Sequence, residues 1–345
     1  MRYCGIDIAS LSSFIYIADV NGTKVMGREV KTEKPELSLA LKPLVKDGLK
    51  IAIEAGNQTT WIYQFLVKLG AEVTVVNPNK VKAIAQSRRK TDKIDAKLLC
   101  ELLRLNALPT AVHMPGAEAR SLRAVLTARR QLIGARTRLC NTVRGQLRQE
   151  GVRLPARSLT SKKSWQALLS MNYESGHIPL VLQAFHRSFL ALTESIHELN
   201  TQLKKKASDS RVELLKTMPS VGVIAALTLI AAVDKIERFG SGRKLISYAG
   251  LAPTLRQSGE RAQYGPISRE GRRELRAVWV QIAHLVANDK RGPAKPLRTW
   301  FLKVALRRGK KTALVALARK LLSIAYQMLR TGEVYNAKEV GRKAA

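Results

Sequence analysis

Acidic residues are scarce in this chain of 345 residues, which has 26 aspartates and glutamates against 60 lysines and arginines. The formal net charge is +34. A compact protein with this charge repels itself unless a polyanion neutralises it, so nucleic acid is the expected partner and a neutral metabolic enzyme is disfavoured. A disordered basic tail is excluded, because 46% of the residues are hydrophobic.

Clustered cysteines and histidines are also missing, as are long apolar runs. The three cysteines and five histidines are dispersed, which argues against a zinc site and a disulfide framework. The N-terminus has no signal-peptide pattern, and the longest apolar run, 221–233, is too short to cross a bilayer. Aromatic residues make up 5%, too few for a reader of single strands by base stacking. We therefore expect a protein of the cytosol.

Strand and helix patterns alternate in the first 80 residues. Strands are expected at 3–9, 13–20 and 24–30, with Asn21-Gly22 as a tight hairpin turn. Helices are then expected at 35–45 and 58–69, each followed by a strand, at 49–54 and 72–76. This order predicts an α/β domain and is compatible with a ribonuclease-H-like sheet.

Helices and positive charge dominate from Lys80 onward. Long helices are expected at 118–149 and 178–215, joined by a connection at 151–161 and arranged as an antiparallel hairpin or a dimeric coiled coil. Residues 291–330 contain 11 lysines and arginines and no acid, a composition typical of phosphate binding.

The last third of the chain predicts a mainly α-helical domain. Residues 219–222 resemble a helix-hairpin-helix turn, in which backbone N–H groups at a helix N-terminus meet a phosphate. Residues 245–271 read as loop and short strands, and helices are expected at 272–287 and 311–329.

Four of the scarce acids occupy unusual positions. Asp7 lies within an apolar strand, where strand propensity and burial disfavour an aspartate. Glu54 ends another apolar strand, and Asp92 and Asp95 share one face of a helix start. Each alone has an ordinary alternative as a strand-end, turn or helix-capping residue. Together they offer the carboxylate oxygens that Mg²⁺ prefers, for a one-metal or two-metal site suited to phosphoryl transfer.

Two sets of motifs carry a resemblance to one family. The N-terminal set is Gly5-Ile6-Asp7-Ile8-Ala9, Ile53-Glu54-Ala55-Gly56 and Thr91-Asp92-Lys93-Ile94-Asp95-Ala96, and the C-terminal set lies at 219–222, 238–239, 247–253, 258–259 and 271–276. In this order and spacing the chain resembles the DEDD transposases of the insertion-sequence one-ten / eleven-eleven type, over nearly its whole length except the helical middle.

The resemblance implies an RNA-guided DNA recombinase. Its N-terminal domain would be a RuvC-like, ribonuclease-H-fold domain in which Asp7, Glu54, Asp92 and Asp95 are the catalytic, metal-binding acids. The expected domains are this one at 1–112, a helical linker and dimerisation region at 113–213, a transposase domain at 214–335 and a tail at 336–345. A homodimer or homotetramer would bind target and donor DNA.

The resemblance also implies a serine that becomes covalently linked to DNA. Ser258 is the best match, because Gly259 permits close approach to a phosphate and Arg256 and Arg261 flank the serine. Ser268 is the strongest rival, and Ser241 and Ser247 are weaker ones. Gln257 departs from the pattern, which often has a second serine at that place.

A serine is a weak nucleophile unless another group activates it. No histidine is near Ser258 in the sequence, so the activating group must come from elsewhere in the fold. We expect Ser258 to meet the four carboxylates in one composite centre. The partners come from one protomer or from two, and the family resemblance favours two.

Basic side chains are expected to contact phosphates, which give affinity and position rather than sequence. The candidates are Arg88, Arg89, Lys90, Arg129, Arg130, Arg256, Arg261, Arg269, Arg272, Arg273, Arg307 and Arg308, together with Arg120, Arg123, Arg136, Arg138, Arg144 and Arg148 on the helix at 118–149. The alternative is a solvated basic face. The family resemblance implies a structured non-coding guide RNA that pairs with target and donor DNA, so that base pairing reads the sequence.

Two other functions remain open on the sequence alone. A Holliday-junction-type nuclease would use the four acids and water, without a covalent protein–DNA intermediate. A non-catalytic nucleic-acid-binding protein would keep the acids for structural reasons.

Overall fold

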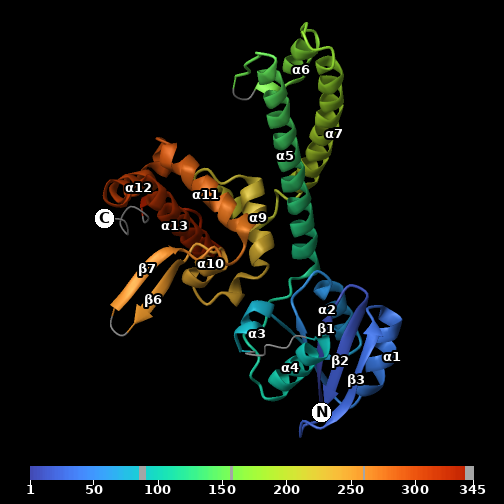
Figure 1. Ribbon diagram of the computed structural model, residues 1–345. Coiled ribbons are helices and arrows are strands. Elements are labelled where there is room, and N and C mark those ends of the chain that lie inside the picture. Colours follow the sequence, from blue (N-terminus) through green and yellow to red (C-terminus); the bar gives the residue numbers. More distant parts are fainter. Residues whose placement is uncertain (85–90, 156–157, 259–260, 339–345) are drawn as a thin grey trace. The chain divides into compact units, whose positions relative to one another are not determined.

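The computed structural model describes residues 1–84, 91–155, 158–258 and 261–338 (Figure 1). The chain divides into two compact units, Met1–Pro115 and Gly116–Ala345. Arg88, Arg89 and Lys90, which were expected to contact phosphates, lie outside the described residues.

The first unit contains a five-stranded mixed sheet. Its strands are β1 (Arg2–Ile8), β2 (Ser12–Ala18), β3 (Lys24–Lys31), β4 (Leu49–Glu54) and β5 (Glu72–Val76). They lie in the order β3-β2-β1-β4-β5. The first three strands pair antiparallel, whereas β4 runs parallel to both β1 and β5. This confirms the predicted α/β class of the N-terminal region.

Helices cover both faces of this sheet (Figure 1). Side chains alternate along each strand, so Cys4 and Ile6 of β1 pack on one face with α1 (Lys34–Val45) and α2 (Thr59–Lys68). The opposite face packs on α3 (Pro78–Ile84) and α4 (Asp92–Arg104), through residues such as Ala52. The apolar alternation that predicts the strands also determines these two cores.

A long helical hairpin begins the second unit. Helix α5 (Ala117–Gln149) packs against α7 (Ile178–Lys204), and α6 (Lys162–Leu169) lies between them in the sequence, after the short 3₁₀ turn η1 (Ser158–Thr160) (Figure 1). Arg129 contacts Asn200 and Arg136 contacts Thr193, so the contacts move forward along α5 and backward along α7. Of the two predicted arrangements, the chain adopts the antiparallel hairpin.

The second long helix ends earlier than the sequence predicts. It stops at Lys204, and a new helix, α8 (Ser210–Lys216), starts after Asp209. The Asp209 carboxylate accepts a hydrogen bond of 2.9 Å from the Arg211 backbone N–H, which caps the new helix and breaks the predicted continuous one.

The rest of the second unit is mainly helical, as predicted. It contains α9 (Val223–Val233), η2 (Ile236–Arg238), α10 (Gly242–Tyr248), α11 (Arg273–Asn288), η3 (Gly292–Ala294), α12 (Lys295–Arg308) and α13 (Lys310–Thr331). A two-stranded hairpin of β6 (Pro253–Ser258) and β7 (Arg261–Ile267) interrupts the helices. Helix α13 is long and apolar enough to span a membrane by length and composition, but its buried Leu317 and Leu321 belong to the core of this unit.

Candidate active site

Two of the predicted catalytic acids lie at the ends of neighbouring parallel strands. Ile6 of β1 pairs with Ile53 of β4 in the parallel register. Asp7 and Glu54 are the next residues on the two strands, so they lie at the same end of the sheet. Side chains two positions apart on a strand point to the same face of the sheet. Asp7 therefore shares the face of Gly5, and Glu54 shares the face of Ala52, which is the face packed against α4. Both carboxylates are half-buried on the face that α4 covers.

Helix α4 brings the other two acids toward the same end of the sheet. The Cys100 thiol lies 3.2 Å from the Tyr3 carbonyl oxygen, and one turn earlier Ala96 lies directly against Gly5. The helix therefore runs antiparallel to β1, and one further turn back is Asp92, at the level of the strand end that carries Asp7. Asp92 is exposed and Asp95 is half-buried.

Local hydrogen bonds fix the backbone around these acids. The Thr59 hydroxyl donates to the Glu54 carbonyl oxygen over 2.9 Å and accepts from the Gly56 N–H over 2.6 Å. The Gln58 amide donates to the carbonyl oxygens of Ala9 and Ser10 over 3.2 and 3.1 Å, which ties the end of β1 to the start of α2. The role of Gln58 is not evident from the sequence, because its partners are nearly 50 residues away and depend on which elements are neighbours.

Thr91 rather than Asp92 caps helix α4. Its hydroxyl accepts a hydrogen bond of 3.3 Å from the Ile94 N–H, which leaves both aspartates in the first turn. Carboxylates there interact favourably with the partial positive charge of the helix N-terminus. The capping role considered for Asp92 is therefore filled by its neighbour.

The donor type of the four acids fits a hard divalent cation, because carboxylate oxygen is the ligand that Mg²⁺ prefers. Within the part of the chain that the structure describes, however, no group of three or more Asp, Glu, His or Cys side chains is assembled closely enough to hold a metal. The four acids share one end of the sheet without being gathered into such a group.

Ser258 is the last residue of strand β6, where the hairpin turns. Its backbone pairs with Arg261 of β7, and Arg256 pairs with Gln263 two positions earlier. The register places Arg261 across from the serine. Of the rival serines, Ser241 caps helix α10, and Ser247 is exposed on that helix.

The base of the serine hairpin is anchored at both strands. The Ser268 N–H donates to the Ala252 carbonyl oxygen over 2.8 Å, and the Arg272 N–H donates to the Tyr248 carbonyl oxygen over 2.9 Å. The Arg276 guanidinium bridges the carbonyl oxygens of Ala249 and Arg269, at 3.1 and 3.2 Å. These contacts fix where the hairpin leaves the helical core of its unit.

Two arginines bind the C-terminal end of helix α9. Arg123 of α5 donates to the carbonyl oxygens of Ala231 and Ala232, over 2.6 and 2.9 Å. Arg238 donates to the Val233 carbonyl oxygen over 2.8 Å. Helix α9 has no basic residue in its last turn, so these guanidinium groups supply the positive charge that a helix C-terminus favours.

Tyr248 joins this cluster. Its hydroxyl donates to the Ala232 carbonyl oxygen over 3.2 Å and accepts from the Arg272 guanidinium over 3.1 Å. Burial raises the pKa of the Tyr248 hydroxyl, but the positive charges of Arg272, Arg238 and Arg123 together outweigh it, and the pKa lies below its ordinary value. Burial, followed by repulsion from Arg272, lowers the pKa of Arg123. The motif at 238–239 was noted in the sequence, but this cluster was not predicted.

The predicted phosphate-binding residues divide into two groups. Several have partners within the protein: Arg129 donates to the Asn200 amide oxygen over 2.6 Å, and Arg130 pairs with Glu274 at 3.3 Å. Six others are exposed, namely Arg138, Arg148, Arg269, Arg273, Arg307 and Arg308. The exposed group is better placed to meet a phosphate, because no carboxylate in the described part of the chain pairs with these arginines.

Comparison with known proteins matches this architecture at both ends of the chain. A family model for DEDD transposases of the IS110 type matches residues 4–151, and a model described as "Transposase IS116/IS110/IS902 family" matches residues 212–297. The first match spans Asp7, Glu54, Asp92 and Asp95, and the second spans Ser258.

Curated relatives extend the similarity over the full length. The transposase for insertion sequence element IS1111A of Coxiella burnetii is 26% identical over 97% of this chain and 91% of its own length. The transposase for insertion sequence element IS1328 of Yersinia enterocolitica is 24% identical over 96% of this chain and 98% of its own. A pilin gene-inverting protein of Moraxella bovis is 29% identical over 77% of this chain and 75% of its own. The chain is therefore a DNA transposase, an enzyme that belongs to the IS110/IS116/IS902 family of insertion-sequence transposases.

Proposed function

We propose that this transposase breaks and rejoins DNA strands through a covalent bond between Ser258 and a DNA phosphate, with a guide RNA that selects the sites. Asp7, Glu54, Asp92 and Asp95 form its second catalytic element and hold Mg²⁺. The observation that carries the proposal is the gathering of these four acids at one end of the sheet, on strands β1 and β4 and the first turn of α4.

The strand order supports a ribonuclease-H-like, RuvC-like identity for the first unit. Three antiparallel strands are followed by two that run parallel to the first, in the order β3-β2-β1-β4-β5. In this topology Asp7 lies on the central strand and Glu54 on its parallel neighbour. A phosphate at that end of the sheet would meet both carboxylates from one side.

The chemistry expected of the carboxylates requires a divalent cation. When bound, Mg²⁺ neutralises the charge of the reacting phosphate and orients it. Asp7 and Glu54 stand on rigid strands and would fix the site, whereas Asp92 and Asp95 stand on a helix start next to residues 85–90, which are outside the described chain. The DEDD family assignment supports a divalent metal, and the oxygen donors favour Mg²⁺ over softer cations.

The proposed covalent step exchanges one phosphodiester for another. A bond forms between the Ser258 hydroxyl oxygen and phosphorus, and the bond from phosphorus to a DNA sugar oxygen breaks. The serine proton passes to a general base, and the departing sugar oxygen takes up a proton. Because the phosphodiester energy is retained in the protein–DNA bond, a hydroxyl of another strand can reverse the reaction and join new DNA ends. The relationship to a protein named for gene inversion supports such breaking and rejoining.

Sequence choice is proposed to come from RNA, and the active assembly is proposed to be a homodimer or homotetramer in the prokaryotic cytosol. The exposed basic residues Arg269, Arg273, Arg307 and Arg308 suit phosphate contacts, which carry no sequence information. A net charge of +34 also suits a protein that holds RNA and DNA together.

The decisive experiment compares Ser258→Ala with Ser268→Ala. Each variant, with the co-purified RNA, is mixed with labelled DNA that carries the ends of the insertion element, and covalent adducts are separated on a denaturing gel. We expect Ser258→Ala to abolish the adduct and Ser268→Ala to retain it, with DNA affinity unchanged in both. An adduct in Ser258→Ala would refute the assigned nucleophile. Cut DNA without an adduct in the unaltered enzyme would favour the nuclease alternative.

A second experiment tests RNA guidance by itself. The full-length protein is purified from its host and the bound RNA is sequenced. We expect one defined transcript from beside the gene that encodes the protein. A random sample of host RNA would contradict the guided function while leaving the covalent chemistry to be judged by the adduct experiment.

A further inference from the structure

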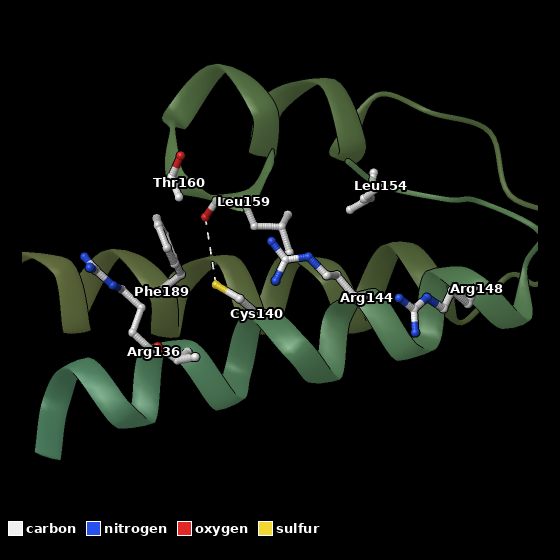
Figure 2. A pocket seen from close by; sticks show the side chains of 9 residues that line it. Arg136, Cys140, Arg144, Arg148, Leu154, Leu159, Thr160 and Phe189 are labelled. Carbon is white, nitrogen blue, oxygen red and sulfur yellow. Dashed lines mark hydrogen bonds between the residues drawn. The ribbon is translucent and has the colours of Figure 1, made fainter. Parts of the chain in front are cut away.

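A cavity of about 600 Å³ lies within the helical hairpin, between α5, the segment around η1 and α7 (Figure 2). Its floor is one face of α5, which carries Arg136, Cys140, Arg144 and Arg148 at intervals of one helical turn. No chemistry proposed for the transposase uses this cavity.

The charge of the cavity is positive and unneutralised. In the described ranges of the chain, no carboxylate pairs with Arg136, Arg144 or Arg148, and no acid lines the cavity. Arg136 donates to the Thr193 hydroxyl over 3.3 Å and Arg144 to the Asn141 amide oxygen over 3.2 Å, both neutral partners. Positive charges gathered in one cavity repel one another, and a bound anion reduces this repulsion. The cavity therefore favours an anionic ligand.

The spacing of the arginines suits a ligand with more than one anionic group. At a rise of about 1.5 Å per residue, Arg144 and Arg148 start about 6 Å apart along the helix and Arg136 about 12 Å from Arg144. Figure 2 shows Arg148 at one end of the cavity, Arg136 at the other and Arg144 between them. A single small anion would use only part of this row.

The walls facing the arginines are largely apolar. Leu154 and Leu159 form the side opposite α5, and Phe189 of α7 closes the end near Arg136. The Arg136 guanidinium lies 5.9 Å from the centre of the Phe189 ring. The ligand therefore combines an anionic part with an apolar, flat part, rather than being a simple salt ion.

We infer that this cavity binds one unpaired nucleotide of a nucleic-acid strand, with its phosphates on the arginines and its base against the leucines. A volume of about 600 Å³ lies in the range of about 300–1,000 Å³ usual for small-ligand sites. It is far too small for a base-paired duplex. Unpaired bases at loops, bulges and ends are the elements that proteins hold individually in this way.

This inference rests on the proposed function, because it assumes that the protein holds nucleic acid. The new element is that the helical hairpin holds one unpaired nucleotide, which a basic surface alone would not do. DNA and RNA strands share the chemistry, so the test includes both.

Cys140 provides a reporter within the cavity. Its thiol lines the cavity and lies 3.9 Å from the Leu159 carbonyl oxygen, whereas Cys4 and Cys100, the other two cysteines, are fully buried. Burial raises the pKa of the Cys140 thiol, and the nearby charges of Arg144 and Arg136 oppose that shift. Alkylation of Cys140 should therefore be measurable at mildly alkaline pH and should respond to anything that fills the cavity.

The experiment measures the rate of Cys140 alkylation by iodoacetamide in the full-length protein. The added probes are single-stranded dT12 or rU12, a DNA duplex, a mononucleotide and a glutamate oligopeptide, with the bound fraction of each nucleic acid followed by fluorescence anisotropy in the same buffer. We expect the single strands to slow alkylation about tenfold at about ten times their dissociation constant. The duplex, bound to the same extent, should slow it by less than about twofold, because its bases are already paired.

Matched variants identify the cavity as the cause. Arg144→Ala combined with Arg148→Ala should weaken the protection by single strands about tenfold or more, because it removes charge-assisted contacts. Arg187→Ala removes a charge from an exposed position on α7 that does not line the cavity, and it should leave the protection intact. Arg144→Lys, which keeps the charge, should retain part of it, and thermal melting establishes that each variant is folded.

Several outcomes would overturn the inference. Strands that bind by anisotropy but leave Cys140 fully reactive would exclude the cavity while leaving nucleic-acid binding intact. Protection by the mononucleotide alone, or by the glutamate peptide alone, would identify a different ligand. Absence of any nucleic-acid binding would refute the proposed function and this inference together, which the anisotropy signal distinguishes from the first case. A difference between dT12 and rU12 protection would identify which strand occupies the site.

Discussion

The α-carbon of Gly5 in strand β1 lies directly against the carbonyl oxygen of Ala96 in helix α4. A β-carbon at position 5 would overlap that oxygen and come within 2.6 Å of the Cys100 nitrogen. No side chain can therefore stand between strand and helix at this crossing. This close contact fixes the position of α4 along strand β1. It therefore places Asp92, one turn before Ala96, at the level of the strand end that carries Asp7.

We predict that Gly5→Ala destabilises the first unit by about 1 to 3 kcal/mol, since the added methyl group must push α4 away from the sheet. Strand exchange should fall more than the stability loss alone explains, because Asp92 and Asp95 move with the helix. Thermal melting and a strand-exchange assay at a temperature where both proteins are folded would measure the two effects.

The matched control for that variant is Gly56→Ala. A β-carbon there would meet only the Thr59 hydroxyl oxygen, at an ordinary 3.8 Å. Its stability should stay close to that of the unaltered protein. If Gly5→Ala melted at the same temperature as Gly56→Ala, the closeness of α4 to β1 would not constrain the site.

The sequence predicts most of the first unit because local patterns are strong there. Apolar alternation and the Asn21-Gly22 turn indicate β1 to β3, and Asp7 and Glu54 stand out as rare charges in apolar strands. The close packing at Gly5 could not be predicted, because it depends on which helix crosses the strand. The same holds for Gln58, whose contacts at Ala9 and Ser10 are distant in the sequence.

The second unit is harder to predict from the sequence where basic residues form part of the folded core. Residues 295–308 read as a basic segment, yet they form helix α12, whose Leu297 and Phe301 are buried in the core. Arg123 has the pattern of a phosphate-binding arginine but caps helix α9 from another helix. Sequence spacing does not distinguish an arginine that binds a helix end from one that binds a phosphate, because both partners are acceptors.

Neutralising Asp7 or Glu54 should abolish strand exchange. We predict that Asp7→Asn and Glu54→Gln each lose activity and also lose stabilisation by Mg²⁺, because each removes a charged oxygen ligand. In the unaltered protein, Mg²⁺ at about 100 times its dissociation constant should add about 2.7 kcal/mol to the free energy of unfolding. Melting curves with and without Mg²⁺ would measure this.

Glu72→Gln is the control for the acid variants. Glu72 begins strand β5, at the opposite end of the sheet from Glu54, and forms an exposed ion pair with Lys50 at 3.3 Å. Exposed pairs contribute little, so activity and the Mg²⁺ effect should both remain. Unchanged Mg²⁺ stabilisation in Asp7→Asn and Glu54→Gln would show that these acids do not hold the metal.

Arg123→Ala should destabilise the second unit. The change removes the Arg123 guanidinium from the Ala231 carbonyl oxygen, whereas the Ala232 carbonyl oxygen keeps its bonds from Arg238 and Tyr248, and we expect a loss of about 1 to 3 kcal/mol in the free energy of unfolding. Arg138→Ala, at an exposed position of the same helix, should change it by less than about 0.5 kcal/mol. Chemical denaturation of both variants would test this, and equal losses would mean that Arg123 does not cap α9.

Tyr248 should be among the first of the eight tyrosines to ionise, and Tyr335 among the last. The arginines around Tyr248 hold its pKa below its ordinary value, whereas burial raises the pKa of Tyr335 to about 12. We predict that absorbance at the phenolate wavelength shows an early step that Tyr248→Phe removes and a late step that Tyr335→Phe removes.

The two tyrosines should also affect stability in opposite directions. Between the lowered pKa of Tyr248 and the ordinary value near 10, the unfolded chain binds more protons than the folded one, so this group makes the free energy of unfolding rise with pH. Between about 10 and about 12 the folded chain keeps the Tyr335 proton that the unfolded chain loses, so that group makes it fall. Comparing each Phe variant with the unaltered protein across this range isolates each contribution. A Tyr248→Phe variant whose phenolate titration matches that of the unaltered protein would show that the arginine cluster does not act on this hydroxyl.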